Sequence, residues 1–505
     1  MNSISFLTRI LSAKQIRAAD QYTIENLPIA SIDLMERASK VFVSWFLKNY
    51  GIRKNIKVFC GTGNNGGDGL AISRLLLEHG CEVNTFCVGD QKNGTPDFLT
   101  NLDRLELVLP PIWIDSKSTI PSMSNEDIVI DALFGSGLTR SIVGVFADVI
   151  HSINQSVVAA VLAVDIPSGL YCDQHSESEA IVRCTYTISF QIPKLTFYFP
   201  QNDEYVGGVQ LVDIGLDESF IDEQKTNHFL INKKFIQSIL KTRRKYTHKG
   251  VQGRNLIVSG SKGKMGAAVL ATRACLRSGA GLVTSFVPAS GNDIMQIAVP
   301  EAMTLADVGM DYITSRPDVE KYDAIGVGPG IGTDKQTANV IKEMLARSEK
   351  PCVLDADALN IIAENSLLEL IPPGSILTPH PGEFERLVGE WKNDFHRLEL
   401  QSNLSKTYGI VIVLKGAHTS ITDASGNVYF NTTGNPGMAT GGSGDVLTGI
   451  VTALLGQGYN SIHAAILAVY VHGVAGNLYA YEFSEEGLIA GDLADSLPKA
   501  FAKLR

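Results

Sequence analysis

The chain has 505 residues, with 43 Lys and Arg against 53 Asp and Glu, and a formal net charge of -10. At about 150 residues per domain, this length predicts two or three domains. Its acidic balance argues against a protein that binds nucleic acid by neutralising phosphates. We find no stretch of about 18 apolar residues without charge, so we expect no membrane-spanning segment. The N-terminus lacks the apolar core of a secretory signal, and seven cysteines without a Cys-x-x-Cys pair favour free thiols over a zinc site. We therefore expect a reducing, cytoplasmic location.

Two halves of similar character follow each other along the chain. Both alternate helical patterns with short apolar runs, and such runs are typical of parallel strands that helices cover on both faces. We predict two α/β domains, over 1–217 and 232–505, joined by an acidic linker over 218–231. In such folds ligands bind at the carboxyl ends of the strands. The predicted strands are 55–60, 127–133, 157–166, 255–260, 324–328, 352–357, 375–380 and 409–416.

A basic cluster over 241–249 opens the second half. A run of like charges is usually a solvated segment. The other interpretation is a loop that faces a phosphate beside an active site, and the sequence alone leaves both open.

The first predicted strand runs into a glycine-rich loop, Gly61–Gly69, and then into a helical pattern that starts at Leu70. Strand, glycine loop and helix form an anion-binding arrangement, because glycine lets the backbone approach a phosphate and the helix N-terminus offers unpaired N–H groups. Asn64, Asn65 and Asp68 stand among these glycines, and a plain turn does not need them. We predict that the loop binds a substrate.

Two further strands of the first half end in an aspartate. Asp131 is followed by Gly135-Ser-Gly137, and Asp165 is followed by Pro167, Ser168 and Gly169. Each aspartate alone could be a turn or cap residue. Together with the glycine loop, however, these segments offer amide, carboxylate and hydroxyl oxygens, which suit a hard cation. Neighbouring carboxylates also favour split acid and base roles.

The motifs GNNGGDG (63–69), VIDALFGSG (129–137), VDIPSG (164–169) and LMERAS (34–39) resemble the epimerase domain of the NAD(P)H-hydrate repair enzymes, over about residues 10–217. The resemblance implies a Rossmann-like fold and hydrated NADH or NADPH as the substrate. It implies a potassium ion held by Asn65, Asp131 and Ser168, with backbone carbonyls of 135–141 assisting. It also makes Asp165 the candidate acid or base, and it implies substrate contacts from Asn64, Asn65, Gly66, Gly67, Asp68 and Asp165.

Four clusters mark the second half. The first, 260–271, leads into a helix and could equally be close packing by small residues. The second, 326–332, is a glycine-rich loop after a strand. The third, LTPHPGEF (377–384), places His380 between two prolines in a rigid, extended loop, which favours a ligand role for this histidine.

The fourth cluster, 435–449, enters a helical pattern and holds Asp445 beside a run of glycines. The glycines put backbone N–H groups at a helix N-terminus, which forms an anion hole. There, a carboxylate can take a proton from a hydroxyl while the N–H groups stabilise a phosphoryl group in transfer. A helix cap alone does not need these glycines. The turn Lys415–Thr419, which follows a strand, could hold the phosphates or the ribose of a nucleotide.

GGSGD (441–445) at a helix start resembles the ribokinase-like superfamily. Together with LDADALN (354–360), TPHPGEF (378–384) and LKGAHT (414–419), it resembles the ADP- or ATP-dependent NAD(P)H-hydrate dehydratase domain, over about residues 235–503. The resemblance implies that Asp445 is catalytic and that the hydrate contacts Ala267, Gly330, His380 and Asp445. It implies an adenine nucleotide, accompanied by Mg²⁺, in contact with Lys415, Gly416, Ala417, His418, Thr419 and Gly444.

Both resemblances in one chain imply a bifunctional enzyme. The first domain would interconvert the S and R hydrates, and the second would phosphorylate the C6 hydroxyl of the S form, so that phosphate leaves and NAD(P)H re-forms. The alternatives are a ribokinase-like vitamin kinase with an accessory domain, or a first half that serves as a scaffold or RNA-binding module. The sequence leaves open the choice between ADP and ATP, the preferred hydrate and the proton route of epimerisation. We expect a homo-oligomer without nucleic-acid or membrane partners.

Overall fold

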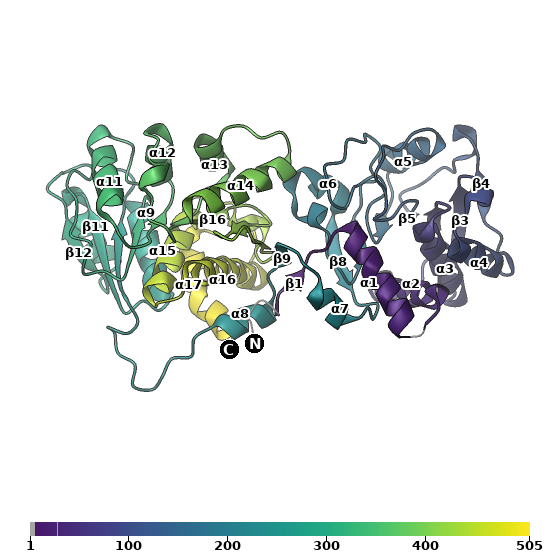
Figure 1. Ribbon diagram of the computed structural model, residues 1–505, viewed down its shortest axis with the longest axis horizontal. Coiled ribbons are helices and arrows are strands. Elements are labelled where there is room, and N and C mark those ends of the chain that lie inside the picture. The colour runs from purple at the N-terminus through teal and green to yellow at the C-terminus, as the bar shows by residue number, and fades with distance from the viewer. Residues whose placement is uncertain (1–5, 28) are drawn as a thin grey trace. The chain divides into compact units, whose positions relative to one another are not determined.

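The computed structural model describes residues 6–27 and 29–505, which form two compact units. The N-terminal unit comprises Arg9–Thr226 and Asn393–Phe395. The C-terminal unit comprises Asn227–Lys392, His396–Arg505 and, of the described N-terminal residues, 6–8. Figure 1 shows both units and labels many of their helices and strands.

The observed boundary differs from the predicted one in two places. The segment 218–231, expected to be an irregular linker, contains helix α7 (Glu218–Glu223) and strand β9 (His228–Leu230), which pairs with β18 (Val428–Phe430). Residues 6–8, expected in the first domain, belong to the C-terminal unit because β1 (Thr8–Arg9) is the neighbour of β9 in its sheet. Short β pairings with few apolar residues leave little signal in a sequence.

The N-terminal unit is built on a seven-stranded sheet of order β4-β3-β2-β5-β6-β7-β8, in which all neighbours are parallel. The predicted strands of the first half are β2, β5 and β6. The strands are β2 (Ile56–Cys60), β3 (Val83–Val88), β4 (Ile112–Ile114), β5 (Ile128–Ala132), β6 (Ala160–Val164), β7 (Tyr186–Phe190) and β8 (Gly208–Val212). The other helices are α1 (Ala13–Asn26), α2 (Ser31–Tyr50), α3 (Asn64–Glu78), α4 (Pro96–Glu106), α5 (Val145–Gln155) and α6 (Asp203–Val206).

Continuous apolar strands follow from burial on both faces of this sheet. Along β2, Val58 packs in one hydrophobic cluster with residues of α2, α3 and α4, whereas its neighbour Phe59 packs in another with residues of α5. Because successive side chains of a strand point to opposite faces, a strand covered on both sides is mostly apolar along its whole length.

Helix α3 begins earlier than the sequence predicts, at Asn64 instead of Leu70. Glycine disfavours a helix by about 1 kcal/mol relative to alanine, which is why this segment resembles a loop. Tertiary packing overrides that preference here. A Cβ at Gly66 would lie 1.7 Å from the carbonyl oxygen of Gly61, and a Cβ at Gly69 would lie 2.6 Å from the Cβ of Ala132. The glycines therefore let the first turns of α3 pack closely on the sheet.

The C-terminal unit has an eleven-stranded sheet of order β1-β9-β18-β17-β16-β15-β14-β13-β10-β11-β12. From β9 to β12 its neighbours are parallel, except where β17 pairs antiparallel with β16 and β18. The remaining strands are β10 (Arg254–Val258), β11 (Leu282–Val287), β12 (Met303–Ala306), β13 (Ala324–Val327), β14 (Val353–Leu354), β15 (Ile376–Leu377), β16 (Val411–Leu414) and β17 (Ser420–Thr422). The helices are α8 (Lys233–Ile239), α9 (Met265–Arg277), α10 (Asn292–Ala298), α11 (Lys335–Arg347), α12 (Asp357–Glu364), α13 (Pro381–Val388), α14 (Asp394–Tyr408), α15 (Ser443–Gly456), α16 (Ser461–Glu482) and α17 (Ala490–Ala502).

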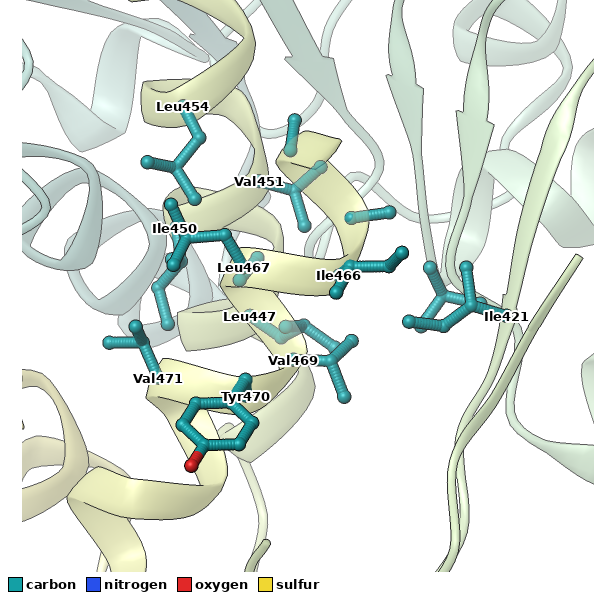
Figure 2. Packing of buried hydrophobic residues seen from close by; sticks show 14 of the residues in the cluster. Ile421, Leu447, Ile450, Val451, Leu454, Ile466, Leu467, Val469, Tyr470 and Val471 are labelled. Carbon is teal, nitrogen blue, oxygen red and sulfur yellow. The ribbon is translucent and has the colours of Figure 1, made fainter. Parts of the chain in front are cut away.

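Helices cover both faces of this sheet as well. Val411 packs with residues of α15, α16 and α17, whereas the next residue, Ile412, packs with residues of α11, α12 and α13. Figure 2 shows part of the first cluster, in which side chains of α15 and α16 meet Ile421 of β17. Full burial of one such aliphatic side chain contributes roughly 1.5–3 kcal/mol, so these layers hold the ends of the strands in place.

One helix departs from the expectation about membrane spans. Helix α16 is 22 residues long and, by length and composition alone, apolar enough to cross a membrane. A helix that is apolar on all sides is found either in lipid or in the core of a large domain. Here, Ala465, Leu467 and Val471 are fully buried, and α16 packs against α15 and α17. Its composition reflects this central position in the C-terminal unit.

Candidate active sites

A cavity of about 710 Å³ opens in the N-terminal unit at the carboxyl ends of β2 and β5. The strand order reverses between these two strands, since β3 and β4 lie on one side of β2 and β5 to β8 lie on the other. Ligands of open α/β sheets bind at such a switch point. The walls come from α1, α2, the start of α3 and the loop after β5.

The structure brings most of the predicted substrate-binding residues of the first half to this cavity. Asn64, Asn65, Asp68 and Asp165 line it. Gly66 and Gly67 do not: both are buried, and a Cβ at Gly67 would lie 2.9 Å from the sulfur of Met35. These two glycines serve the packing of α3, which in turn positions the polar residues on either side of them.

Asp165 forms an ion pair in the cavity wall. It follows β6 in a left-handed backbone conformation, with φ of +68°. Its Oδ1 accepts hydrogen bonds from Lys194 Nζ at 2.7 Å and from the backbone N–H of Phe190 at 3.0 Å. The Lys194 side chain is 0% exposed and also donates to Ser189 Oγ at 2.8 Å. Burying an ammonium group is costly unless it is paired, so Asp165 and Lys194 form a fixed charge pair.

Sequence reasoning missed Lys194, although a signal was present. This lysine stands in the segment IPKLTFYF (192–199), which is otherwise almost entirely apolar. A charge inside an apolar run is usually buried, and a buried charge needs a partner. It also missed Asp20 of α1, which lines the same cavity but belongs to no recognisable motif.

Two carboxylates of this cavity hold their protons more tightly than usual. Burial raises the pKa of Asp20 to about 7, where the charge of Asp165 adds to the effect and that of Lys194 opposes it. Burial, followed by the charges of Asp165 and Asp20, also raises the pKa of Asp68 well above its ordinary value. The cavity therefore contains acids that hold a proton up to a higher pH than an ordinary aspartate, beside an aspartate in an ion pair.

The residues predicted to hold potassium meet around the backbone of Phe134. Asp131 is fully buried and accepts hydrogen bonds from Ser168 Oγ at 2.6 Å and from the Ser168 N–H at 2.8 Å. Burial raises the pKa of Asp131 to about 6, against the opposing effect of these hydrogen bonds. The carbonyl oxygen of Phe134 lies 3.0 Å from Asn65 Nδ2 and 3.3 Å from Ser168 Oγ.

This oxygen-rich group fits a hard monovalent cation. Carboxylate, hydroxyl, amide and backbone oxygens are the ligands that such ions prefer. Among the residues that the structure describes, no group of three or more His, Cys, Asp or Glu side chains could hold a metal ion. A cation here would therefore depend on mixed oxygen ligands, as Asn65, Asp131, Ser168 and Phe134 offer.

A second cavity, of about 440 Å³, lies in the C-terminal unit between the loop before α9, the end of β13 and the start of α15. It too occupies a switch point, because β10 has β13 on one side and β11 on the other. Ala267, Gly330 and Asp445, which the resemblance predicts to contact the hydrate, line this cavity. Gly330 has φ of +64°, and a Cβ there would lie 3.0 Å from the Cβ of Ala267, so a larger residue would narrow the cavity.

Asp445 lies in the first turn of α15, which begins at Ser443 after Gly442 in a left-handed conformation with φ of +90°. Burial raises the pKa of Asp445 to about 7, where Asp355 adds to the effect and Lys415 opposes it. A general base works best when its pKa is near the operating pH. The helix N-terminus beside it offers N–H groups to an anion.

A buried network surrounds Lys415 behind this cavity. Lys415 Nζ lies 2.8 Å from Asp355 Oδ1 and 3.7 Å from Glu383 Oε2, and Thr448 Oγ1 donates to Asp355 Oδ2 at 2.6 Å. Burial lowers the pKa of Lys415, but Asp355 and Glu383 outweigh it, so the pKa is raised. Asp355, Glu383 and Thr448 lie within motifs of the sequence, but no feature of those motifs predicts that these three residues form a network.

The structure places the remaining predicted residues around this network. Gly444 is close to Lys415, since a Cβ there would lie 3.3 Å from Lys415 Nζ. The turn Gly416–Thr419 is closed by Thr419 Oγ1, which donates to the carbonyl of Gly416 at 3.0 Å; Ala417 is exposed, and His418 is partly buried.

His380 does not line the 440 Å³ cavity. It caps α13, where its Nδ1 accepts hydrogen bonds from the N–H groups of Gly382 at 3.1 Å and Glu383 at 3.3 Å. Its side chain is half exposed, and Glu383 links it to Lys415.

The basic cluster over 241–249 is solvated. All of its residues except Thr247 are exposed, and none of them lines either of the two cavities. Arg243 and Lys241 bind the backbone carbonyls of Gly279 and Gln457. Of the two interpretations of this segment, the structure supports the solvated loop.

Sequence profiles of two known families match the chain. The profile described as YjeF-related protein N-terminus matches residues 31–196, and the profile described as NAD(P)H-hydrate dehydratase matches residues 255–499. The bifunctional NAD(P)H-hydrate repair enzyme of Moorella thermoacetica is 36% identical to the chain, over 98% of this chain and 97% of its own. The chain belongs to the family of bifunctional NAD(P)H-hydrate repair enzymes.

Other repair enzymes match to a similar extent. That of Coxiella burnetii is 33% identical over 96% of this chain and 98% of its own, and that of Escherichia coli is 32% identical over 99% and 95%. A crystal structure of the ADP/ATP-dependent NAD(P)H-hydrate dehydratase from Bacillus subtilis, co-crystallized with ATP and Mg²⁺, is 31% identical and covers 54% of this chain and 98% of that one, with a TM-score of 0.49.

Membership of the repair-enzyme family confirms the predicted fold class and function. The chain is an α/β protein with a Rossmann-like domain followed by a ribokinase-like domain. It is an NAD(P)H-hydrate epimerase and an ADP- or ATP-dependent NAD(P)H-hydrate dehydratase. The alternative of a vitamin kinase does not account for the match over the first half.

Proposed function

We propose that each unit carries out one of the two reactions in its own cavity. The 710 Å³ cavity is the epimerase site, and the 440 Å³ cavity is the dehydratase site. The observation that carries this assignment is that each cavity lies at a switch point and has its own aspartate, Asp165 in one and Asp445 in the other. Neither cavity includes a residue of the other unit.

In the dehydratase, Asp445 takes the proton from the C6 hydroxyl of the S hydrate. Its raised pKa suits this task, because the carboxylate both ionises and accepts protons near neutral pH. The N–H groups at the start of α15 stabilise the phosphoryl group in transfer, and Lys415 offsets the charge of the nucleotide phosphates. Phosphate is a good leaving group, so its elimination restores the dihydronicotinamide.

Mg²⁺ supplies charge neutralisation when it is bound with the nucleotide. Asp355 and Glu383, the buried acids of this site, are already paired with Lys415. We therefore expect phosphate oxygens and water to provide most of the ligands of Mg²⁺, as is common for this ion.

In the epimerase, Asp165 exchanges a proton with the hydrated nicotinamide while Lys194 fixes its position. Asn64 and Asp68, at the start of α3, contact the substrate. Potassium would be held by Asn65, Asp131 and Ser168, with the carbonyl of Phe134, and would supply a positive charge beside the loop after β5. A cytoplasmic location and a homo-oligomeric state remain predictions.

The assignment is tested with a mixture of R and S NADH hydrates, ADP or ATP, and the purified chain. We expect the absorbance of the reduced nicotinamide to return fully. Without nucleotide, chromatography should still show the two epimers interconverting. A chain that phosphorylates hydroxyethylthiazole but does not restore NADH would contradict the assignment and favour the vitamin kinase.

A further inference from the structure

Asp20 is the least expected residue in the wall of the epimerase cavity. It lies on α1 and lines the cavity together with Asp68 and Asp165. Among the described residues, its carboxylate has no hydrogen-bond or ion-pair partner, whereas Asp165 is bound to Lys194. Asp20 is partly buried, and shielding a carboxyl group from water without a partner is costly. When a native protein retains such a group, the group calls for an explanation, for example a role in catalysis.

The charges around Asp20 come from several elements. Asp165 and Lys194 face it from the ends of β6 and β7, and Asp68 faces it from α3. Arg17 of α1 and Arg140 of the loop after β5 also line the cavity, as does Asp97 of α4. With burial as the main cause, this environment raises the pKa of Asp20 to about 7. At neutral pH, about half of the Asp20 side chains therefore carry a proton, while Asp165 is held in its ion pair.

We propose that Asp20 is the second proton-transfer residue of the epimerase and acts together with Asp165. This proposal rests on the assignment of the 710 Å³ cavity to the epimerase. Inversion at C6 requires that the hydroxyl departs from one face of the ring and that water arrives at the other. One carboxyl group on one face cannot serve both events, and two carboxyl groups with different proton affinities can.

The chemical steps balance with these two residues and water. Protonated Asp20 gives its proton to the C6 hydroxyl, the C6–O bond breaks with its electron pair on oxygen, and water leaves. The lone pair of the ring nitrogen forms a double bond to C6. Water then adds to C6 from the other face, the double bond returns its electrons to nitrogen, and Asp165 accepts the proton of the incoming water. Transfer of that proton from Asp165 to Asp20 through water restores the starting state.

The test compares four forms of the full-length chain: wild type, Asp20→Asn, Asp20→Glu and Asp165→Asn. Epimerisation of pure R hydrate is followed by chromatography, without nucleotide, and the spontaneous rate is subtracted. We expect Asp20→Asn to lower kcat by at least ~10²-fold, with KM changed only a few-fold. Asp20→Glu should recover part of kcat. The wild-type rate should fall as the pH rises through about 7, the pKa of Asp20, and Asp20→Asn should lose this limb of the profile.

A matched control is Glu25→Gln, which removes another carboxylate from α1. Glu25 is exposed, accepts a hydrogen bond from Gln21 at 2.6 Å and does not line the cavity. This variant should epimerise at close to the wild-type rate. Dehydration of pure S hydrate, which needs only the C-terminal unit, shows that each variant is folded there, and circular dichroism checks the whole chain.

The outcomes separate this proposal from the assignment on which it rests. If Asp165→Asn is inactive and Asp20→Asn retains wild-type kcat, the role of Asp20 is wrong and the cavity assignment stands. An Asp20→Asn variant with raised KM and normal kcat would make Asp20 a binding residue only and would also overturn the proposal. If both variants epimerise normally, the cavity is not the epimerase site. If Asp20→Asn fails to fold, the wild type still provides a test: an epimerisation rate that does not fall as the pH rises through about 7 would refute the proposal.

Discussion

Asp355 joins Lys415 to Thr448: one of its carboxylate oxygens lies 2.8 Å from the Lys415 ammonium, and the other accepts the Thr448 hydroxyl at 2.6 Å. This arrangement ties the ends of β14 and β16 to the second turn of α15. Because Asp445 lies one turn earlier on α15, Asp355 helps to fix the position of the proposed catalytic carboxylate.

Asp355→Asn should therefore affect both stability and activity. Removing one partner of a buried ion pair typically costs about 3–5 kcal/mol, because the other charge stays buried. Glu383, at 3.7 Å from Lys415, offsets part of this loss. We expect a decrease of at least about 2 kcal/mol in the free energy of unfolding, together with slower dehydration. Urea unfolding and single-turnover dehydration measure the two effects.

Asp495→Asn is the matched control for this change. Asp495 pairs with Arg273 at 2.7 Å, but both side chains are more than 40% exposed. Exposed ion pairs contribute about 0–1 kcal/mol, so the unfolding curve should hardly move. Equal decreases in the free energy of unfolding of both variants would show that the contribution of Asp355 to stability does not depend on its burial.

The dehydratase should lose activity in acid as Asp445 becomes protonated. A base must be ionised to accept a proton, so kcat/KM should fall as the pH decreases through about 7, the pKa of Asp445. Asp445→Asn should bind nucleotide normally, dehydrate at least ~10²-fold more slowly and lack this acidic limb. Isothermal titration with ADP and stopped-flow absorbance check both statements. Near-normal turnover in the variant would exclude Asp445 as the base.

The two sites should work independently. Asp165→Asn preserves the left-handed backbone, which asparagine tolerates, but removes the negative charge that pairs with buried Lys194. With a mixture of epimers, NADH recovery should stop once the S hydrate is consumed, apart from slow spontaneous epimerisation. Dehydration of pure S hydrate should continue at close to the normal rate. Loss of both activities together would mean that the units share a site or depend on each other to fold.

Lys194→Met combined with Asp165→Asn provides a control for stability. The single variant leaves an unpaired buried ammonium, whereas the double variant removes that charge. We expect the double variant to unfold at a higher temperature than the single variant while remaining inactive as an epimerase. A double variant with restored epimerase activity would exclude a chemical role for Asp165.

Potassium should support the epimerase through Ser168 and Asp131. Ser168→Ala removes the hydroxyl that lies 2.6 Å from Asp131 and 3.3 Å from the carbonyl of Phe134. We expect the concentration of KCl that gives half-maximal epimerisation to rise several-fold at constant ionic strength, with choline as the balancing cation. The dehydratase serves as the internal control. The proposed potassium site would be contradicted if the wild-type epimerisation rate does not depend on potassium. Crystals grown in potassium that show only water at this position would contradict it as well.

The sequence predicted part of both sheets, namely β2, β5, β6, β10 and β13 to β16, and singled out the aspartates, because both leave strong local signals. Runs such as 127–133 are largely apolar since helices cover both faces, and Asp131, Asp165 and Asp445 stand where strands or glycine runs end. Parallel strands bring such ends to one edge of a sheet. The clustering of Asp131 with Ser168, and of Asp445 with Gly330, therefore follows from chain order and strand type.

The missed residues act through tertiary contacts, and a local pattern does not identify the partner: the apolar run around Lys194 indicates only that this charge is buried. Asp20 lies on an ordinary amphipathic helix, and only the packing of α1 brings it to the cavity. Lys194 pairs with Asp165, which lies 29 residues earlier in the chain. The start of α3 was misplaced for a related reason: glycine appears in loops for its freedom and in close packing for its small size, and sequence alone does not distinguish the two.

Strand β1 has a consequence for the order in which the protein can fold during synthesis. Its residues leave the ribosome well before those of β18, yet its neighbour β9 is joined to the sheet through β18, which ends at Phe430. At 5–20 residues per second, roughly 20–80 s pass before that site exists. Strand β1 is thus synthesised early but joins its sheet late. A fragment that starts at residue 232 would lack both β1 and β9, and its β18 would become a bare edge that can recruit another chain.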